Sequence, residues 1–250
     1  PDAEAGAAAL SSFLLAVDAD DVEVVPEFVP AVVEAGAVAA AVDARVGGSA
    51  ACPITTPPYD ERQGYLQATN ARVAWNVDGG RGQGVRVADV EGDWNGKHED
   101  LPALTHVVGR PQGWGWRQHG TAVLGVIAAK DNGKGMTGIV PGVDGVYTAS
   151  LGDVGAARAI HETAKKLSPG DVLIIELHGP GPNSRGKKGQ RGFVPMEWWQ
   201  AEFEAILWAT SKGVVVVEAA GNGAEDLDAP IYDHKFDRAR RDSGALLVGD

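Results

Sequence analysis

The chain has 250 residues, of which 44% are apolar and 22% charged, a composition typical of a globular protein with one large domain or two small ones. Its net charge of −12 argues against electrostatic binding to nucleic acid or to an anionic membrane, because such binding depends on clustered lysine and arginine. No run approaches the ~20 apolar residues that a membrane-spanning helix requires, and a single cysteine, Cys52, excludes a disulfide within the chain.

The first 58 residues differ in composition from the rest. They are rich in alanine and valine and are interrupted by prolines and glycines, and the segment from Cys52 to Pro58 has the prolines of an extended connector. The apolar stretch from Ala7 to Val17 follows acidic residues, not the basic residues of a signal peptide, so we expect it to be folded. We therefore divide the chain into an appended unit, residues 1–58, and a main domain, residues 59–250.

A glycine-rich loop, Gly79–Gly84, precedes the apolar run VRVADVE. Dinucleotide-binding loops have their glycines after a strand and at the start of a helix, so this reversed order does not favour a nucleotide site. The run from Val85 to Ala88 predicts a buried strand that places Asp89 and Glu91 at its carboxyl end.

Downstream, the pattern alternates between helix and strand. The sequence QHGT at 118–121, followed by AVLGVIAAK, predicts that His119 stands at the start of a buried helix. Alternation of this kind indicates βαβ units, hence an α/β fold with a parallel sheet, helices on both faces and ligands beyond the carboxyl ends of the strands. The later elements are expected as a strand over 146–150, a helix over 154–168, a strand over 171–177, a basic solvated loop over 178–195, a helix from 196 to 213 and a strand over 214–217.

Three stretches together are similar to the motifs of one enzyme family. QHGTAVLGVIAA with GMTGIVPG behind it resembles the histidine motif of subtilisin-like serine proteases, the subtilases, and VVVVEAAGNG resembles their oxyanion-asparagine motif. The resemblance covers roughly residues 59–250 and implies a subtilisin-like parallel sheet with helices on both faces. It also implies a serine endopeptidase in which His119 is the general base and the amide of Asn222 stabilises the oxyanion.

The acidic partner of His119 departs from the family pattern. Aligning HEDL at 98–101 with the family's His-Pro-Asp-Leu stretch, without a gap, places Glu91 where subtilases have aspartate. We expect Asp89 to face the opposite side of the strand or its core. The resemblance thus implies a Glu-His-Ser triad, in which the longer glutamate reaches His119 only if the backbone or rotamer adjusts. The sedolisin relatives also use glutamate but lack this histidine.

The nucleophile is missing from the pattern. None of the eight serines stands in the Gly-Thr-Ser-Met-Ala-like motif of the family, and the surroundings of the most tempting, Ser243, resemble the strand that precedes that motif. We therefore expect the C-terminal part of the catalytic domain to be missing from this chain, with the nucleophile carried by a second chain after processing or by sequence beyond residue 250.

The resemblance also suggests where a peptide or protein substrate binds. Leu177-His178-Gly179 and Ala219-Ala220-Gly221 are similar to the segments that clasp the substrate backbone and line the specificity pocket. His178, like Glu218 next to the second segment, is not the small or apolar residue usual there. Both side chains either tune specificity or pair within the core.

No cofactor is expected for catalysis. Asp100 and Asn132 match two ligand positions of a structural calcium site in the family, although calcium requires six or more oxygens. His98 lacks the spacing of a zinc motif. Two alternatives to the protease remain open, a non-catalytic subtilase-fold module that binds peptides or acts as a scaffold, and a metal-dependent hydrolase built on Glu91, Asp93 and His98. The resemblance slightly favours a secreted location.

Overall fold

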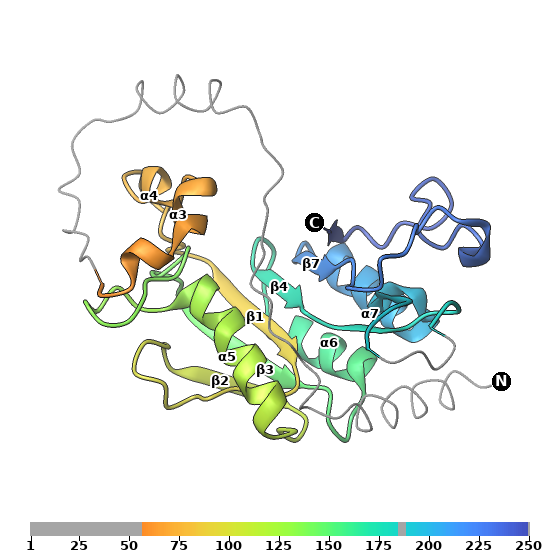
Figure 1. Cartoon of the computed structure of the whole chain (residues 1–250), viewed down its shortest axis with the longest axis horizontal. Coiled ribbons are helices and arrows are strands. Elements are labelled where there is room, and N and C mark those ends of the chain that lie inside the picture. Colours follow the sequence, from red (N-terminus) through yellow and green to blue (C-terminus); the bar gives the residue numbers. More distant parts are fainter. Residues whose placement is uncertain (1–56, 185–188, 250) are drawn as a thin grey trace.

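A six-stranded parallel sheet forms the centre of the protein (Figure 1). The structure is a computed structural model that describes residues 57–184 and 189–249. In spatial order the strands run β2-β3-β1-β4-β7-β8, and every neighbouring pair in this sheet is parallel. Their bounds are β1 (Arg86–Glu91), β2 (Leu104–Val108), β3 (Gly145–Ser150), β4 (Val172–Ile175), β7 (Val215–Ala219) and β8 (Leu246–Val248).

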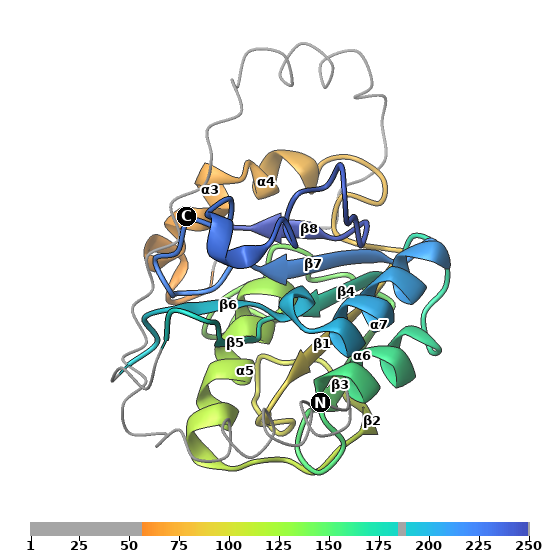
Figure 2. The same cartoon turned by 90° about the vertical axis from the view of Figure 1, so that its right-hand side faces the viewer.

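Helices cover both faces of this sheet, which confirms the predicted α/β class. Helix α5 (Trp114–Ala128) lies on one face, while α6 (Ala156–Ala164) and α7 (Gln200–Ser211) lie together on the other (Figure 2). Short helices complete the described chain, namely α3 (Gly64–Ala68), α4 (Ala71–Ala74) and the 3-10 turns η2 (Asp60–Arg62), η3 (Met196–Trp198) and η4 (Pro230–Tyr232). The predicted appended unit falls almost wholly outside the described residues.

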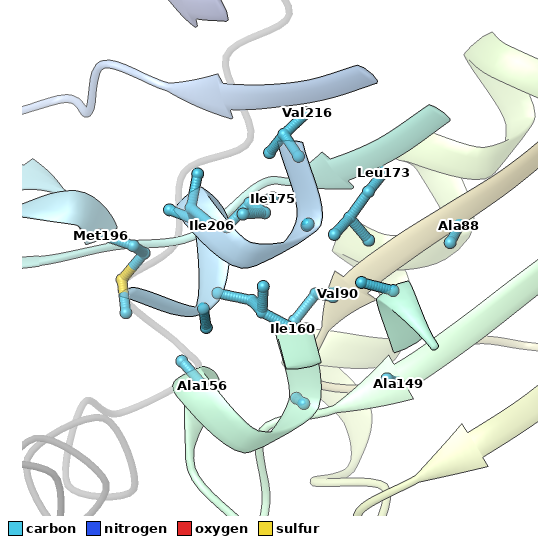
Figure 3. Close-up of a cluster of buried hydrophobic side chains, with 14 of the residues drawn as sticks. Ala88, Val90, Ala149, Ala156, Ile160, Leu173, Ile175, Met196, Ile206 and Val216 are labelled. Atoms are coloured by element: carbon cyan, nitrogen blue, oxygen red, sulfur yellow. The ribbon is translucent and has the colours of Figure 1, made fainter. Parts of the chain in front are cut away.

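The larger core lies between the sheet and the helices α6 and α7. Ala88 and Val90 point from β1 into this core, where they meet Leu173 from β4 and Ile160 from α6 (Figure 3). Burying a large aliphatic side chain stabilises a fold by about 1.5–3 kcal/mol. Because side chains alternate along a strand, Asp89 and Glu91 on β1 project to the opposite face of the sheet, the face that α5 covers.

Several boundaries differ from those predicted. Helix α6 starts later than predicted because Gly155, with φ of +80°, directly precedes its first turn, and it ends at Ala164 instead of residue 168. The helix expected from residue 196 begins as the separate turn η3, breaks at the extended Trp199, and continues as α7 with Leu207 exposed instead of buried. The edge strand β2 was not predicted, since its residues are half-buried or exposed and lack a continuous apolar run.

The two ends of the segment 178–195, which was expected to be a basic solvated loop, are strands. They form an antiparallel hairpin in which β5 (His178–Pro180) pairs with β6 (Phe193–Pro195), and the middle of β6 is fully buried. The basic residues at 185–188 lie outside the described part of the chain. No helix of the described residues is long and apolar enough to cross a membrane.

Candidate active site

The predicted site residues gather at the carboxyl edge of the central strands. Glu91 is the last residue of β1, and Glu176 comes directly after β4. The register pairs Val90 with Ile175, so Glu91 and Glu176, the next residue on each strand, lie side by side at the ends of neighbouring parallel strands. The loop that carries Asn222 begins where β7 ends. Ligands of parallel sheets bind at this edge.

His119 reaches this edge from α5, although not from the start of the helix. The helix begins at Trp114, after Gly113 with φ of +104°, so His119 is its sixth residue and lies in the second turn. The prediction of the helix start was therefore wrong by about one turn. The reason is that the Trp-Gly-Trp stretch before QHGT carries no helix periodicity, while the backbone at Gly113 fixes the boundary.

Glu91 and His119 form a direct pair. Nδ1 of His119 donates a hydrogen bond to Oε2 of Glu91 at 2.5 Å, and the other carboxylate oxygen accepts the backbone N–H of Gly92 at 2.9 Å. The Glu91 side chain is 0% exposed, whereas that of His119 is 35% exposed. Within the described residues, Nε2 of His119 has no hydrogen-bond partner. The carboxylate thus fixes the tautomer and leaves Nε2 free to act as a base.

Gly120 makes room for the longer acid. A Cβ added at Gly120 would lie 2.9 Å from Cγ of Glu91 and 2.5 Å from the carbonyl oxygen of Asp93. Cγ is the methylene by which glutamate exceeds aspartate. The missing side chain at Gly120 therefore provides the space that lets Glu91 reach His119.

The charges around His119 determine its protonation. Burial alone lowers its pKa, but the hydrogen bond and charge of Glu91, together with the charges of Glu176 and Asp89, raise the pKa to about 9. Glu176 was not singled out from the sequence. Its position after a buried strand, in register with Glu91, is the signal that could have identified it. Burial raises the pKa of Glu176 as well.

Asp89 lies in the core, as one of the two expected placements has it, but it is on the same face of β1 as Glu91. Residues two apart in a strand share a face, so the expectation of opposite faces was wrong. One oxygen of Asp89 accepts the indole N–H of Trp94 at 2.7 Å, and the other has no partner among the described residues. Burial and the nearby charge of Glu91 raise the pKa of Asp89 well above its usual range.

The two predicted substrate segments lie next to each other. His178 and Gly179 belong to β5, and Leu177 before them is buried in the core. Gly221 has φ of +92°, and a Cβ there would meet Cβ of His178 at 3.3 Å. Ala219 ends β7, and the backbone N–H of Ala220 donates to the carbonyl of Val248.

His178 and Glu218 both have partners inside the protein. Nδ1 of His178 accepts the backbone N–H of Asn222 at 3.0 Å, and its ring packs edge-on against Phe193. Glu218 is buried, and one of its oxygens accepts the backbone N–H of Glu197 at 2.9 Å. Burial and the charge of Glu197 raise the pKa of Glu218 to about 8. These contacts favour pairing within the core over a role in specificity.

Ser243 does not face His119. It is buried, and its hydroxyl donates to a carboxylate oxygen of Glu197. No serine of the described residues forms a hydrogen bond with His119. Ser243 lies three residues before strand β8, which agrees with the expectation that its surroundings form a strand.

The side chains suggested as metal ligands bond to other groups of the protein. Asp93 forms an ion pair with Arg117 at 2.9 Å, and Nδ1 of His98 accepts the backbone N–H of Asp100. The amide nitrogen of Asn132 points to Asp100 at 3.4 Å, so this side chain does not offer its oxygen to a shared cation. Asp100 and Asn132 alone do not supply the six or more oxygen ligands that a calcium ion takes. In the described part of the chain, no group of three or more histidine, cysteine or acidic side chains could hold a metal.

Comparison with known proteins identifies a set of relatives. Residues 93–238, more than half of the chain, match the model of the Subtilase family. Alkaline elastase YaB from Bacillus sp. (strain YaB) is 32% identical over 155 residues, covering 60% of this chain and 37% of the relative. Subtilisin BL from Lederbergia lenta is 31% identical over 158 residues, covering 60% and 52%. The chain thus spans about half or less of the length of these relatives.

A solved structure of a protease from Pseudoalteromonas arctica PAMC 21717 is also similar, with a TM-score of 0.47 and 23% sequence identity. The similarity covers 66% of this chain and 59% of that protein.

Proposed function

The chain belongs to the subtilase family, and on that premise we propose that it supplies the general base, the orienting acid and an oxyanion donor of a serine endopeptidase. In this proposal His119 is the base, Glu91 is its acid and Asn222 provides the donor. The substrates are peptides or proteins, since the reaction is hydrolysis of a peptide bond. Leu177, His178 and Gly179 on one side and Ala219, Ala220 and Gly221 on the other would hold the substrate backbone.

The single observation that carries this proposal is the pair of Glu91 and His119. A carboxylate without solvent exposure holds Nδ1 of an imidazole whose Nε2 has no partner in the described chain. An ordinary surface ion pair has both partners in solvent and contributes little to stability, whereas the Glu91 carboxylate in this pair is fully buried. Within a family of hydrolases, this arrangement is the one that general base catalysis needs.

The chemistry proceeds in two steps. Nε2 of His119 accepts the proton of a serine hydroxyl while the oxygen attacks the carbonyl carbon of the substrate, and the side-chain N–H of Asn222 stabilises the oxyanion. The imidazolium then gives its proton to the leaving amine, and an acyl-enzyme remains. Water, deprotonated by His119, then attacks this ester, and the imidazolium returns the proton to the serine oxygen as the carboxylic acid product leaves. Glu91 stabilises the imidazolium in both steps.

We propose that the serine comes from a segment beyond residue 250 or from a second chain. The outermost strand supports this, because Leu246 and Val248 on β8 are 54% and 42% exposed. An exposed apolar strand at a sheet edge is a site where a further strand pairs. A segment that adds a strand beside β8 would bring its following residues to the same carboxyl edge as His119.

A fluorophosphonate probe tests the proposal, since it labels an activated serine. The complete protein, with any associated chain, is treated with the probe, and the labelled residue is located by peptide mapping. We expect the label on a serine outside residues 1–250 and its loss in His119→Ala, but not in His234→Ala, which removes an exposed histidine. A label on Ser243, or labelling that survives His119→Ala, contradicts the proposal. Complete absence of labelling in folded protein favours the non-catalytic peptide-binding or scaffold module.

A further inference from the structure

The hairpin of β5 and β6 holds the loop of Asn222 from both sides. The backbone N–H of Asn222 donates to Nδ1 of His178 at 3.0 Å, and the backbone N–H of Gly192 donates to the carbonyl of Gly223 at 3.0 Å. A Cβ at Gly223 would lie 2.0 Å from the carbonyl oxygen of Phe193, so only glycine permits this close approach. The backbone on each side of Asn222 is therefore fixed by the hairpin.

The hairpin also contacts the functional group of Asn222. Its side-chain Nδ2 donates to Oε1 of Gln190 at 2.7 Å. Gln190 lies just before β6 and is half-buried. A primary amide has two N–H groups, so one can bond to Gln190 while the other remains available to an oxyanion. The bond to Gln190 also restrains rotation of the amide, which would otherwise exchange its oxygen and nitrogen.

We propose that Gln190 is a positioning residue for the oxyanion donor, acting by holding the Asn222 amide with one N–H directed to the substrate. This inference rests on the proposed protease function. An oxyanion donor contributes to catalysis only when it is oriented before the charge develops. The opposite role, in which Gln190 occupies the donor and inhibits the enzyme, predicts a change of opposite sign when Gln190 is removed.

The other contact to the Asn222 loop is compatible with a fixed donor. Nδ1 of His178 must be unprotonated to accept the backbone N–H of Asn222. Burial and the charge of His119 lower the pKa of His178 to about 4, so it remains a neutral acceptor at higher pH. The loop therefore keeps its second anchor when Gln190 is replaced, and the Gln190 variant isolates the effect on the side-chain amide.

Steady-state peptide hydrolysis by the complete protein tests the proposal. Removal of a whole oxyanion donor costs about 10²–10³ in turnover, a value known for subtilisin itself and borrowed here. We expect the smaller effect of misorientation in Gln190→Ala, a fall in kcat of about tenfold with KM changed by less than about twofold. Gln190→Glu retains an acceptor oxygen and should recover most of the loss. Gln200→Ala, which removes a surface glutamine bonded to Glu204, is the matched control and should leave kcat unchanged.

A rise in kcat for Gln190→Ala would overturn the proposal in favour of inhibition, and an unchanged kcat would overturn it outright. A second measurement does not depend on turnover. In the complete protein, hydrogen exchange of the Asn222 side-chain amide, followed by NMR, should be faster in Gln190→Ala than in wild type. If the complete wild-type protein lacks both fluorophosphonate labelling and activity, the protease function fails. If the Asn222 exchange rate is the same in both proteins, the Gln190 inference fails.

Discussion

Replacement of Glu91 by glutamine should lower the pKa of His119 strongly. The amide oxygen can still accept the Nδ1 hydrogen bond, so the change removes the negative charge with little change in shape. The pKa of His119 is about 9 with Glu91 in place, against 6.5 for an unperturbed histidine. Burial then lowers the pKa with only the more distant Glu176 and Asp89 to oppose it, so the pKa of His119 in the variant should fall from about 9 towards 6.5.

The assay is an NMR titration of the His119 ring in the complete protein, between pH 4 and 10. Asp89→Asn is the matched control, because Asp89 lies on the same face of β1 but bonds to the indole of Trp94 and not to His119. We expect the control to change the pKa of His119 less than Glu91→Gln does. An equal or larger shift in Asp89→Asn would refute the assignment of Glu91 as the acid that faces His119.

The same variant should change catalysis by the complete protein. Only the neutral imidazole can accept a proton, so activity should rise with pH through the pKa of His119. Glu91→Gln should move this limb of the pH profile to lower pH. It should also reduce kcat on the order of 10⁴-fold, the effect seen when an amide replaces the triad carboxylate in another serine protease. A profile whose midpoint does not move would contradict the role of Glu91.

Three further predictions concern packing and stability. Gly120→Ala should abolish the pairing of Glu91 with His119, which an NMR titration would detect as a lower pKa of the imidazole. Gly125→Ala in the same helix, where the added Cβ would lie 3.6 Å from the sulfur of Met136, should instead stabilise the fold by about 0.5–1 kcal/mol. Equal effects of the two variants would argue against the steric explanation. His178 has a pKa of about 4 in the folded protein against 6.5 when unfolded, so its contribution to stability should be complete above pH 6.5 and decline as the pH falls to about 4. His178→Gln should weaken this dependence of the melting temperature on pH in thermal melts. An unchanged dependence would contradict the lowered pKa. Leu173→Ala should reduce the free energy of unfolding by about 2–5 kcal/mol in urea titrations. Leu207→Ala, at a position 42% exposed, should change it by about 0.5 kcal/mol or less. A loss below about 1 kcal/mol for Leu173→Ala would contradict the burial of Leu173 in the core.

Local pattern was sufficient for most of the fold. The apolar runs around Ala88, Leu173 and Val216 predict buried strands because a parallel strand covered by helices on both sides has few polar positions. Their alternation with helical segments fixes the parallel order. Strand β2 could not be predicted in this way, since it lies at the edge of the sheet and its side chains are only partly covered.

Short runs of adjacent residues were enough to predict the class of the fold and the residue types at the site. QHGT and AAGNG are local patterns, and the position of HEDL selects Glu91 over Asp89 by alignment. These inferences need no knowledge of distant contacts, because each depends on residues adjacent in the chain.

How these residues act on one another depends on contacts between elements that are distant in the chain. Asp89 and Glu91 share a face of β1, so their different environments depend on where α5 lies and on the absent side chain at Gly120. The raised pKa of His119 sums charges from β1 and from the end of β4. The bond between Gln190 and Asn222 joins residues 32 positions apart. Such contacts cannot be predicted from periodicity, because the energy that stabilises them arises only when separate strands and loops meet.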